Sequence, residues 1–251
     1  DARIETISTS GQNLSSAFTW KQDVSSSIGS ITFQNNGSKI QMYGNTRNSG
    51  HNKIYTDNNT SDEISNQEMG FSYNLNFGDS FNGAGVLLNT NVENNKLYGY
   101  MLFISNNSVG YIYELKGVPT GPDYSYSSQI TDSYYATLLD SASMGNTGQF
   151  KLQTTKSSLN IIKDGVNIKT VALPRHYGWG FGFFSDHYSH NCSRIGEFAL
   201  ENITMETTMG KSLDEVLKQP TWREDATRFV VNISDIKLPE LEPTSEKYSV
   251  V

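Results

Sequence analysis

The chain has 251 residues, of which 36% are hydrophobic, 12% aromatic and 18% charged, and its net charge at pH 7 is −7. The aromatic content excludes a disordered chain, and a membrane span is excluded because nothing approaches about 18 consecutive apolar residues. The acidic balance disfavours nucleic acids and anionic membranes as partners, because both require a basic face.

Asn, Ser and Thr number 24, 31 and 21, which favours strands and turns over helices. Apolar side chains alternate at period two along residues 71–77, the pattern of a strand with one buried face. Asp164-Gly165 predicts a type I′ hairpin turn, because both central residues of that turn need a positive φ. No helix is predicted before residue 210. The predicted strands are, in chain order, residues 28–33, 39–43, 70–77, 85–89, 97–104, 109–115, 134–139, 150–154, 158–163 and 166–172.

A dozen or so strands in about 200 residues imply two packed sheets, because one open sheet of that size would leave a face uncovered. The sequence therefore predicts an all-β fold over residues 1–207, a two-sheet antiparallel sandwich of the jelly-roll type.

The composition changes near residue 208. Residues 209–251 hold 14 charged residues and three of the six prolines. Ser212 and Glu215 form a capping-box pattern at the start of a helix over residues 213–218, and residues 228–233 have the pattern of a strand. Residues 208–251 are therefore predicted to be a helix–strand extension that either docks on the sandwich or begins a following domain.

Residues 178–186, Gly-Trp-Gly-Phe-Gly-Phe-Phe-Ser-Asp, are followed by a polar loop and by residues 195–204, Ile-Gly-Glu-Phe-Ala-Leu-Glu-Asn-Ile-Thr. This pattern resembles the closing strands of concanavalin A-like (laminin G-like) domains of the lectin/glucanase superfamily. Residues 81–89, 98–103 and 159–168 resemble other strands of the same superfamily, so the resemblance covers about residues 1–207. The Asn- and Ser-rich style resembles Gram-positive bacterial surface adhesins. That implies an extracellular, cell-surface location and neighbouring domains of the same chain as partners.

The polar loop predicted over residues 185–192 is the first candidate for ligand binding, because function concentrates on loops held by rigid sheets. Asp186, His187 and Tyr188 are expected to point outward from it and to bind the ligand. Two alternatives stay open for the same loop. His190 and Cys192 could turn inward and fix it, or they could join His187 as metal ligands, although the spacing matches no established zinc pattern.

A sugar-binding site needs flat rings to stack on sugar C–H faces and polar groups to bind hydroxyls. Tyr124 and Tyr126 are predicted to supply rings and Asp123 a polar contact, because their Gly, Pro and Ser neighbours indicate an exposed loop. Four further aromatic residues are candidates, the last two of which are favoured as core residues: Tyr134, Tyr135, Tyr177 and Trp179.

Calcium is the cofactor that the resemblance leaves open, because many sandwich lectins use it. The candidate ligands are loop residues with oxygen donors, namely Asp79, Asn82, Asp123 and Asp186. No segment resembles the legume-lectin metal loop, so the sequence does not decide whether Ca²⁺ is bound.

An enzyme of this superfamily would need two carboxylates on one strand face, about 5 Å apart for a retaining glycosidase. No Glu-x-Asp-x-x-Glu segment occurs. Glu197 and Glu201 share a face of one predicted strand, but burial of Phe198 and Leu200 would turn both carboxylates to solvent as an ordinary polar face. We therefore expect no catalysis.

The sequence thus predicts a non-catalytic, extracellular recognition module that binds a glycan or a host-surface protein through loops at the sandwich edge. A nucleic-acid partner and membrane insertion are not expected. The alternatives are a structural spacer domain of a large surface protein and a polysaccharide-active enzyme.

Overall fold

The structure, a computed structural model, describes residues 5–8, 13–44, 48–56, 60–77, 81–121, 129–187 and 196–209, and of residues 5–8 only the backbone. The predicted extension over residues 208–251 lies almost wholly outside these ranges and stays a prediction. Within the described part, no helix has both the length and the apolar character needed to cross a bilayer.

The described part of the chain is built almost entirely from β-strands, joined by one short α-helix and one 3₁₀ turn. Their bounds are β1 (Glu5–Ser8), α1 (Leu14–Ala17), β2 (Trp20–Asp23), β3 (Gly29–Gln34), η1 (Asn35–Gly37), β4 (Lys39–Gly44), β5 (Gly50–Thr56), β6 (Ile64–Asn74), β7 (Phe81–Glu93), β8 (Lys96–Ser105), β9 (Val109–Pro119), β10 (Ala136–Ser143), β11 (Thr147–Thr154), β12 (Ser158–Lys163), β13 (Val166–Ala172), β14 (Gly180–His187) and β15 (Gly196–Met209).

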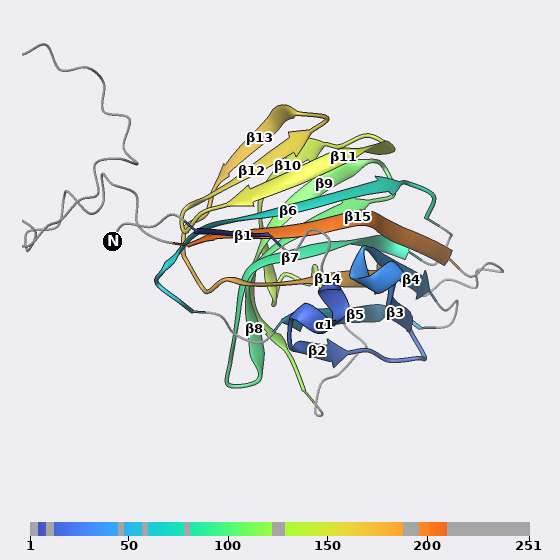
Figure 1. The fold of residues 1–251 in the computed structure, drawn as a ribbon. Coiled ribbons are helices and arrows are strands. Elements are labelled where there is room, and N and C mark those ends of the chain that lie inside the picture. The colour runs from blue at the N-terminus through green and yellow to red at the C-terminus, as the bar shows by residue number, and fades with distance from the viewer. Residues whose placement is uncertain are drawn as a thin grey trace, which may run out of the picture. The chain divides into compact units, whose positions relative to one another are not determined.

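These strands form two antiparallel sheets that pack face to face (Figure 1). The first sheet has the order β13-β12-β11-β6-β15-β4-β3, with β1 paired to β15, and the second has the order β10-β9-β8-β7-β14-β5-β2. The predicted all-β, two-sheet antiparallel sandwich is confirmed.

The main core lies between the two sheets, where apolar residues at alternate strand positions meet. In β14, for example, Phe181 and Phe183 face the first sheet, and both belong to the inter-sheet cluster. Trp20 of β2 closes one side of this cluster by an edge contact to Phe181 at 5.5 Å between ring centroids.

The outer face of the second sheet is also apolar, which is unusual because an antiparallel sheet in a sandwich normally leaves that face to water. Phe184 of β14, Leu87 of β7 and Leu115 of β9 are all buried there. The same cluster includes Ile130, which belongs to the connection between β9 and β10, and Ala136, the first residue of β10. That connection therefore covers part of the outer face.

The hairpin of β12 and β13 has the bounds that the sequence predicts, with φ values of 48° at Asp164 and 82° at Gly165. We expect Gly165→Ala to lower the free energy of unfolding by about 1 kcal/mol, because a Cβ is strained at this φ. A Cβ at this position would meet nothing within 4 Å, so the effect isolates the backbone. Urea unfolding measures it. Gly165→Asn should lose less, because Asn tolerates the left-handed conformation. Equal stability of the two variants would contradict this prediction.

The prediction of no helix before residue 210 is wrong at one place. Residues Leu14–Ala17 form a short helix, capped by Asn13, whose side-chain Oδ1 accepts a hydrogen bond from the Ser15 N–H at 3.1 Å. A single turn is too short to show a helical period. Strand β5 was not predicted either, because its first half reads His51, Asn52 and Lys53.

Candidate functional site

Asp186 and His187 lie at the end of β14, a strand of the second sheet, and not in a loop as the sequence suggested. The expectation that they point outward to solvent is wrong, because both side chains are fully buried. The ladder continues to this point because Asp186 pairs with His51 of β5 and with Gly83 of β7. Tyr188, like His190 and Cys192, lies outside the described residues.

The Asp186 carboxylate is fixed by two donors on the outer face of the second sheet. The backbone N–H of Ile130 donates to Oδ1 at 3.0 Å, and the Asn82 side-chain amide donates to Oδ2 at 2.9 Å. Burial raises the pKa of Asp186 to about 7, although both hydrogen bonds act to lower it. A carboxylate in this position is an anchor for the chain that crosses above it.

His187 points the other way, toward the space between the sheets. Its ring packs against Phe81 with centroids 4.5 Å apart, and its Nε2 lies 2.8 Å from Ser185 Oγ. The structure therefore gives His187 a packing position.

A second buried anchor lies on β5 and β2. Lys53 and Asp23 are directly opposite each other in the ladder, and Lys53 Nζ lies 3.1 Å from Asp23 Oδ2. Burial lowers the pKa of Lys53 to about 8, against the opposing effect of the Asp23 charge. Tyr55 Oη also donates to Asp23 Oδ2, at 3.0 Å. No sequence signal marked this pair.

Both anchors hold the connection between β9 and β10. Lys53 Nζ donates to the Pro119 carbonyl at 3.0 Å, and the Gly121 N–H donates to Asp23 Oδ1 at 3.2 Å. Further along, Ile130 is held by Asp186. We call Pro119, the last residue of β9, together with the described parts of this connection, residues 120–121 and 129–135, the strap. Asp123, Tyr124 and Tyr126, the predicted sugar-binding residues, fall between these two parts and lie outside the described residues.

Tyrosines gather on the outer face next to the strap. Tyr111 and Tyr113 of β9 and Tyr135 of the strap are half-buried and pack on the outer-face cluster. The side chain of Tyr134 is 85% exposed, and its ring makes an edge contact with Tyr135 at 6.0 Å between centroids. We call Tyr111, Tyr113, Tyr134 and Tyr135 the tyrosine surface.

The tyrosine surface connects to Asp186. Burial raises the pKa of Tyr113, and the charges of Tyr111 and Asp186 add to this rise. Leu138 of β10 pairs with Tyr113 in the ladder and exposes an apolar side chain beside it. The sequence singled out Tyr134 and Tyr135 but missed Tyr111 and Tyr113, whose alternation along β9 is the signal that could have found them. Tyr177 is half-buried and Trp179 is buried in the structure, as expected of core residues.

The predicted calcium ligands fit Ca²⁺ poorly where they are described. Both oxygens of Asp186 accept hydrogen bonds, Oδ1 from the Ile130 N–H and Oδ2 from the Asn82 amide, so the carboxylate is already engaged by the protein. Asp79 and Asp123 lie outside the described residues. Within the described residues, no group of three or more His, Cys, Asp or Glu side chains could hold a metal ion.

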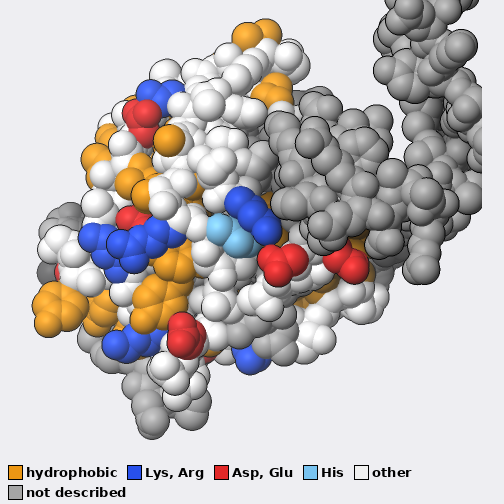
Figure 2. Space-filling model, turned by 90° about the vertical axis from the view of Figure 1, so that its left-hand side faces the viewer, with side chains coloured by type: hydrophobic (Ala, Val, Ile, Leu, Met, Phe, Trp, Pro, Cys, Tyr) orange, Lys and Arg blue, Asp and Glu red, His pale blue; other side chains and the backbone are white. Residues whose placement is uncertain are grey.

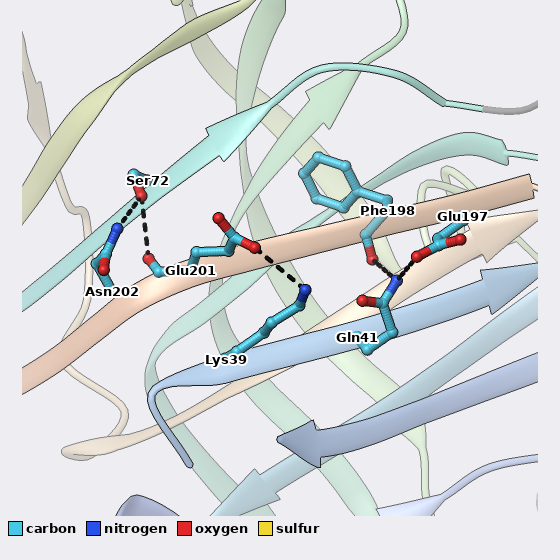
Figure 3. A network of polar contacts seen from close by, with 7 residues as sticks. All are labelled: Lys39, Gln41, Ser72, Glu197, Phe198, Glu201 and Asn202. Atoms are coloured by element: carbon cyan, nitrogen blue, oxygen red, sulfur yellow. Dashed lines mark hydrogen bonds and ion pairs between the residues drawn. The ribbon is translucent and has the colours of Figure 1, made fainter. Parts of the chain in front are cut away.

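Glu197 and Glu201 lie on the solvent face of the first sheet, as the alternation with buried Phe198 and Leu200 predicts (Figure 3). Each carboxylate has a partner of its own. Glu197 Oε1 accepts from Gln41 Nε2 at 2.8 Å, and Glu201 Oε1 lies 3.1 Å from Lys39 Nζ. The two carboxylates thus belong to separate contacts of an ordinary polar face.

No family model matches the sequence. An uncharacterized protein of Clostridium acetobutylicum is 31% identical over 85 residues, which are 32% of this chain and 9% of that protein. The match therefore spans a small part of that relative's length.

Several solved structures are similar to this chain at low sequence identity. The carbohydrate binding module CBM66 from Bacillus subtilis gives a TM-score of 0.48 at 11% identity and covers 75% of this chain and 96% of its own. The exoplasmic/lumenal domain of VIP36 in its Ca²⁺-bound form gives 0.48 at 12%, covering 78% and 86%. An endo-1,3-beta-glucanase from Streptomyces sioyaensis gives 0.46 at 10%, covering 80% and 92%. Nothing about ligand or activity follows from likenesses at this level.

Proposed function

We propose that this chain is a non-catalytic recognition module that binds a glycan on the tyrosine surface. The observation that carries the proposal is the 85% exposure of Tyr134, whose ring contacts Tyr135 of the strap, while Tyr135 packs on the same outer-face cluster as Tyr111 and Tyr113 of β9. Exposed aromatic rings are unfavourable in water unless a partner covers them, and groups of them mark binding sites.

The chemistry of this surface suits a sugar. Tyrosine rings present flat apolar faces to sugar C–H groups, while their hydroxyls donate to and accept from sugar hydroxyls. The sheet below holds Tyr111 and Tyr113 in register, and the strap is tied down by Asp186 and by the Lys53–Asp23 pair. A surface held in this way needs little reordering on binding, which favours affinity.

We also propose that this module has no catalytic activity. The two buried carboxylates of the outer face, Asp23 and Asp186, each accept hydrogen bonds that hold the strap, so neither is placed to attack a glycosidic bond. As the resemblance to adhesin modules implies, the proposal also places the module outside the cell, on the surface.

Tyr134→Ala is expected to weaken glycan binding about tenfold, which corresponds to about 1.4 kcal/mol, because one stacking ring is removed. Stability should not change, since the Tyr134 side chain is almost fully exposed. A glycan array identifies a binding sugar, and calorimetric titration of that sugar compares the two chains.

The matched control is Tyr43→Ala, because Tyr43 is an exposed tyrosine of β4 in the other sheet. It should bind as the unchanged chain does. Equal affinity of the Tyr134→Ala chain, or an array without any hit for a folded sample, would overturn the proposed function.

A further inference from the structure

One end of the space between the two sheets contains polar side chains whose hydrogen bonding is incomplete. Each of five residues there carries a buried nitrogen or oxygen atom without a hydrogen-bond partner. Such atoms are rare in native proteins, and a concentration of them indicates that something polar belongs among them. We call these five residues the inter-sheet site; their atoms are Asn89 Oδ1, Asn91 Oδ1, Thr154 Oγ1, His176 Nδ1 and Trp179 Nε1.

Contacts between the strands bring these residues together from both sheets. Asn89 of β7 donates from Nδ2 to the Thr155 carbonyl at 2.8 Å, which places it beside Thr154 at the end of β11. Thr90, the residue after Asn89, pairs with Gly180, the residue after Trp179. The rings of His176 and Trp179 lie 4.7 Å apart between centroids.

The inter-sheet site lies near the surface at this end of the sandwich. Asn89, Thr154 and Trp179 are buried, whereas His176 and Asn91 are half-buried and are therefore the two residues of the site that contact solvent. Figure 2 looks onto the side that faces left in Figure 1 and shows a histidine side chain next to a basic side chain, with acidic side chains nearby. Lys156 and Asp62 form an ion pair at 3.3 Å, and their charges act in opposite directions on the pKa of His176.

The unpartnered atoms require a ligand that both donates and accepts. Trp179 Nε1 can only donate a hydrogen bond. The NH₂ group of Asn89 already donates to the Thr155 carbonyl, so the atom of Asn89 left without a partner is its oxygen, which can only accept. The indole N–H disfavours the binding of a cation, and the two asparagine oxygens disfavour the binding of an anion. Burial lowers the pKa of His176, which favours the neutral ring. Hydroxyl groups meet all these requirements, because each can donate and accept at once.

We propose that the inter-sheet site binds an uncharged, hydroxyl-bearing ligand, a sugar residue, separately from the tyrosine surface. The two sites lie on different sides of the second sheet, because Asn89 of β7 donates across to Thr155, which follows β11 of the first sheet, whereas the tyrosines pack on the outer-face cluster. Ordered water has the same hydroxyl chemistry, and the experiment separates the two.

The experiment follows the Trp179 indole N–H by two-dimensional NMR while D-glucose, D-galactose, D-mannose or N-acetylglucosamine is added to the 251-residue chain. Comparison with Trp179→Phe assigns the signal. A sugar that accepts a hydrogen bond from Nε1 should shift this signal downfield in a saturable way. Thr154→Val, which removes the hydroxyl and keeps the shape, should weaken that saturation at least tenfold.

The Tyr134→Ala chain, measured in the same titration, distinguishes the two sites. Its sugar concentration at the midpoint of the Trp179 shift should equal that of the unchanged chain. Thermal unfolding without sugar checks the Thr154→Val chain, which should be at least as stable as the parent because an unpartnered buried hydroxyl is gone. The proposal is overturned if no sugar moves the Trp179 signal, which would leave water as the occupant. It is also overturned if the sugar titration of the Thr154→Val chain has the same midpoint as that of the unchanged chain. The same holds if Tyr134→Ala abolishes the sugar-induced shift of the Trp179 signal.

Discussion

Lys53→Met is expected to lower the free energy of unfolding by about 3–5 kcal/mol, because it leaves the buried Asp23 carboxylate without its ammonium partner. Tyr55 Oη and the Gly121 N–H would still donate to Asp23, but neither carries a compensating charge. The same change removes the hydrogen bond to the Pro119 carbonyl, which holds one end of the strap. Chemical denaturation measures the loss.

Two further chains show whether the charge pair is the cause. Lys53→Met combined with Asp23→Asn should recover most of the loss, because asparagine still accepts from Gly121 and buries no charge. Lys39→Met breaks a surface pair with Glu201 and should cost at most about 1 kcal/mol. A double variant no more stable than Lys53→Met alone would show that the loss comes from packing and not from an unpaired charge.

Asp186→Asn is expected to change how stability depends on pH. The folded-state pKa of Asp186 is about 7, above the value of about 3.9 for an unfolded chain, so the folded chain holds this proton more tightly. The stabilisation that follows is fully present below about pH 4 and is lost as the pH rises to about 7. Over this window the unchanged chain should lose on the order of 4 kcal/mol relative to Asp186→Asn.

Asparagine suits this test because it is close in shape to the carboxyl group and can still accept from the Ile130 N–H. His51 lies opposite Asp186 in the ladder and is present in both chains. Denaturant unfolding between pH 4 and pH 8 measures the difference. Asp62→Asn, at an exposed carboxylate, serves as the control and should follow the unchanged chain. A constant difference between Asp186→Asn and the unchanged chain over this range would contradict the raised pKa.

The elements that the sequence predicts best are those fixed by local signals. The hairpin of β12 and β13 has its predicted bounds because Asp164-Gly165 specifies the turn and the flanking strands are apolar. The polar face of β15 follows from simple alternation, which turns Glu197 and Glu201 outward once Phe198 is buried. Neither inference needs knowledge of distant residues.

The candidate site depends on contacts that are distant in sequence, and there the predictions fail. Asp186 looks like the start of a loop because it is a charged residue that precedes a histidine. Its burial comes from Ile130, which is 56 positions earlier in the chain and covers it. Lys53 was missed for the same reason, since a lysine is rarely buried and its partner Asp23 lies on another strand.

The sequence indicates only two of the four residues of the tyrosine surface. Tyr134 and Tyr135 stand out because two aromatic residues follow each other next to Asp132 and Ser133. The sequence predicts a strand through Tyr111 and Tyr113. It does not indicate which face of that strand is covered by another segment of the chain. That depends on where the strap crosses, and the strap is placed by Asp186 and Asp23.

The most direct test of the account is a crystal structure of this chain with the tightest-binding sugar from the glycan array. The account predicts that a sugar ring lies against Tyr134, within contact of at least one other ring of the tyrosine surface. A glycan that is bound elsewhere, with the tyrosine surface empty, would contradict it.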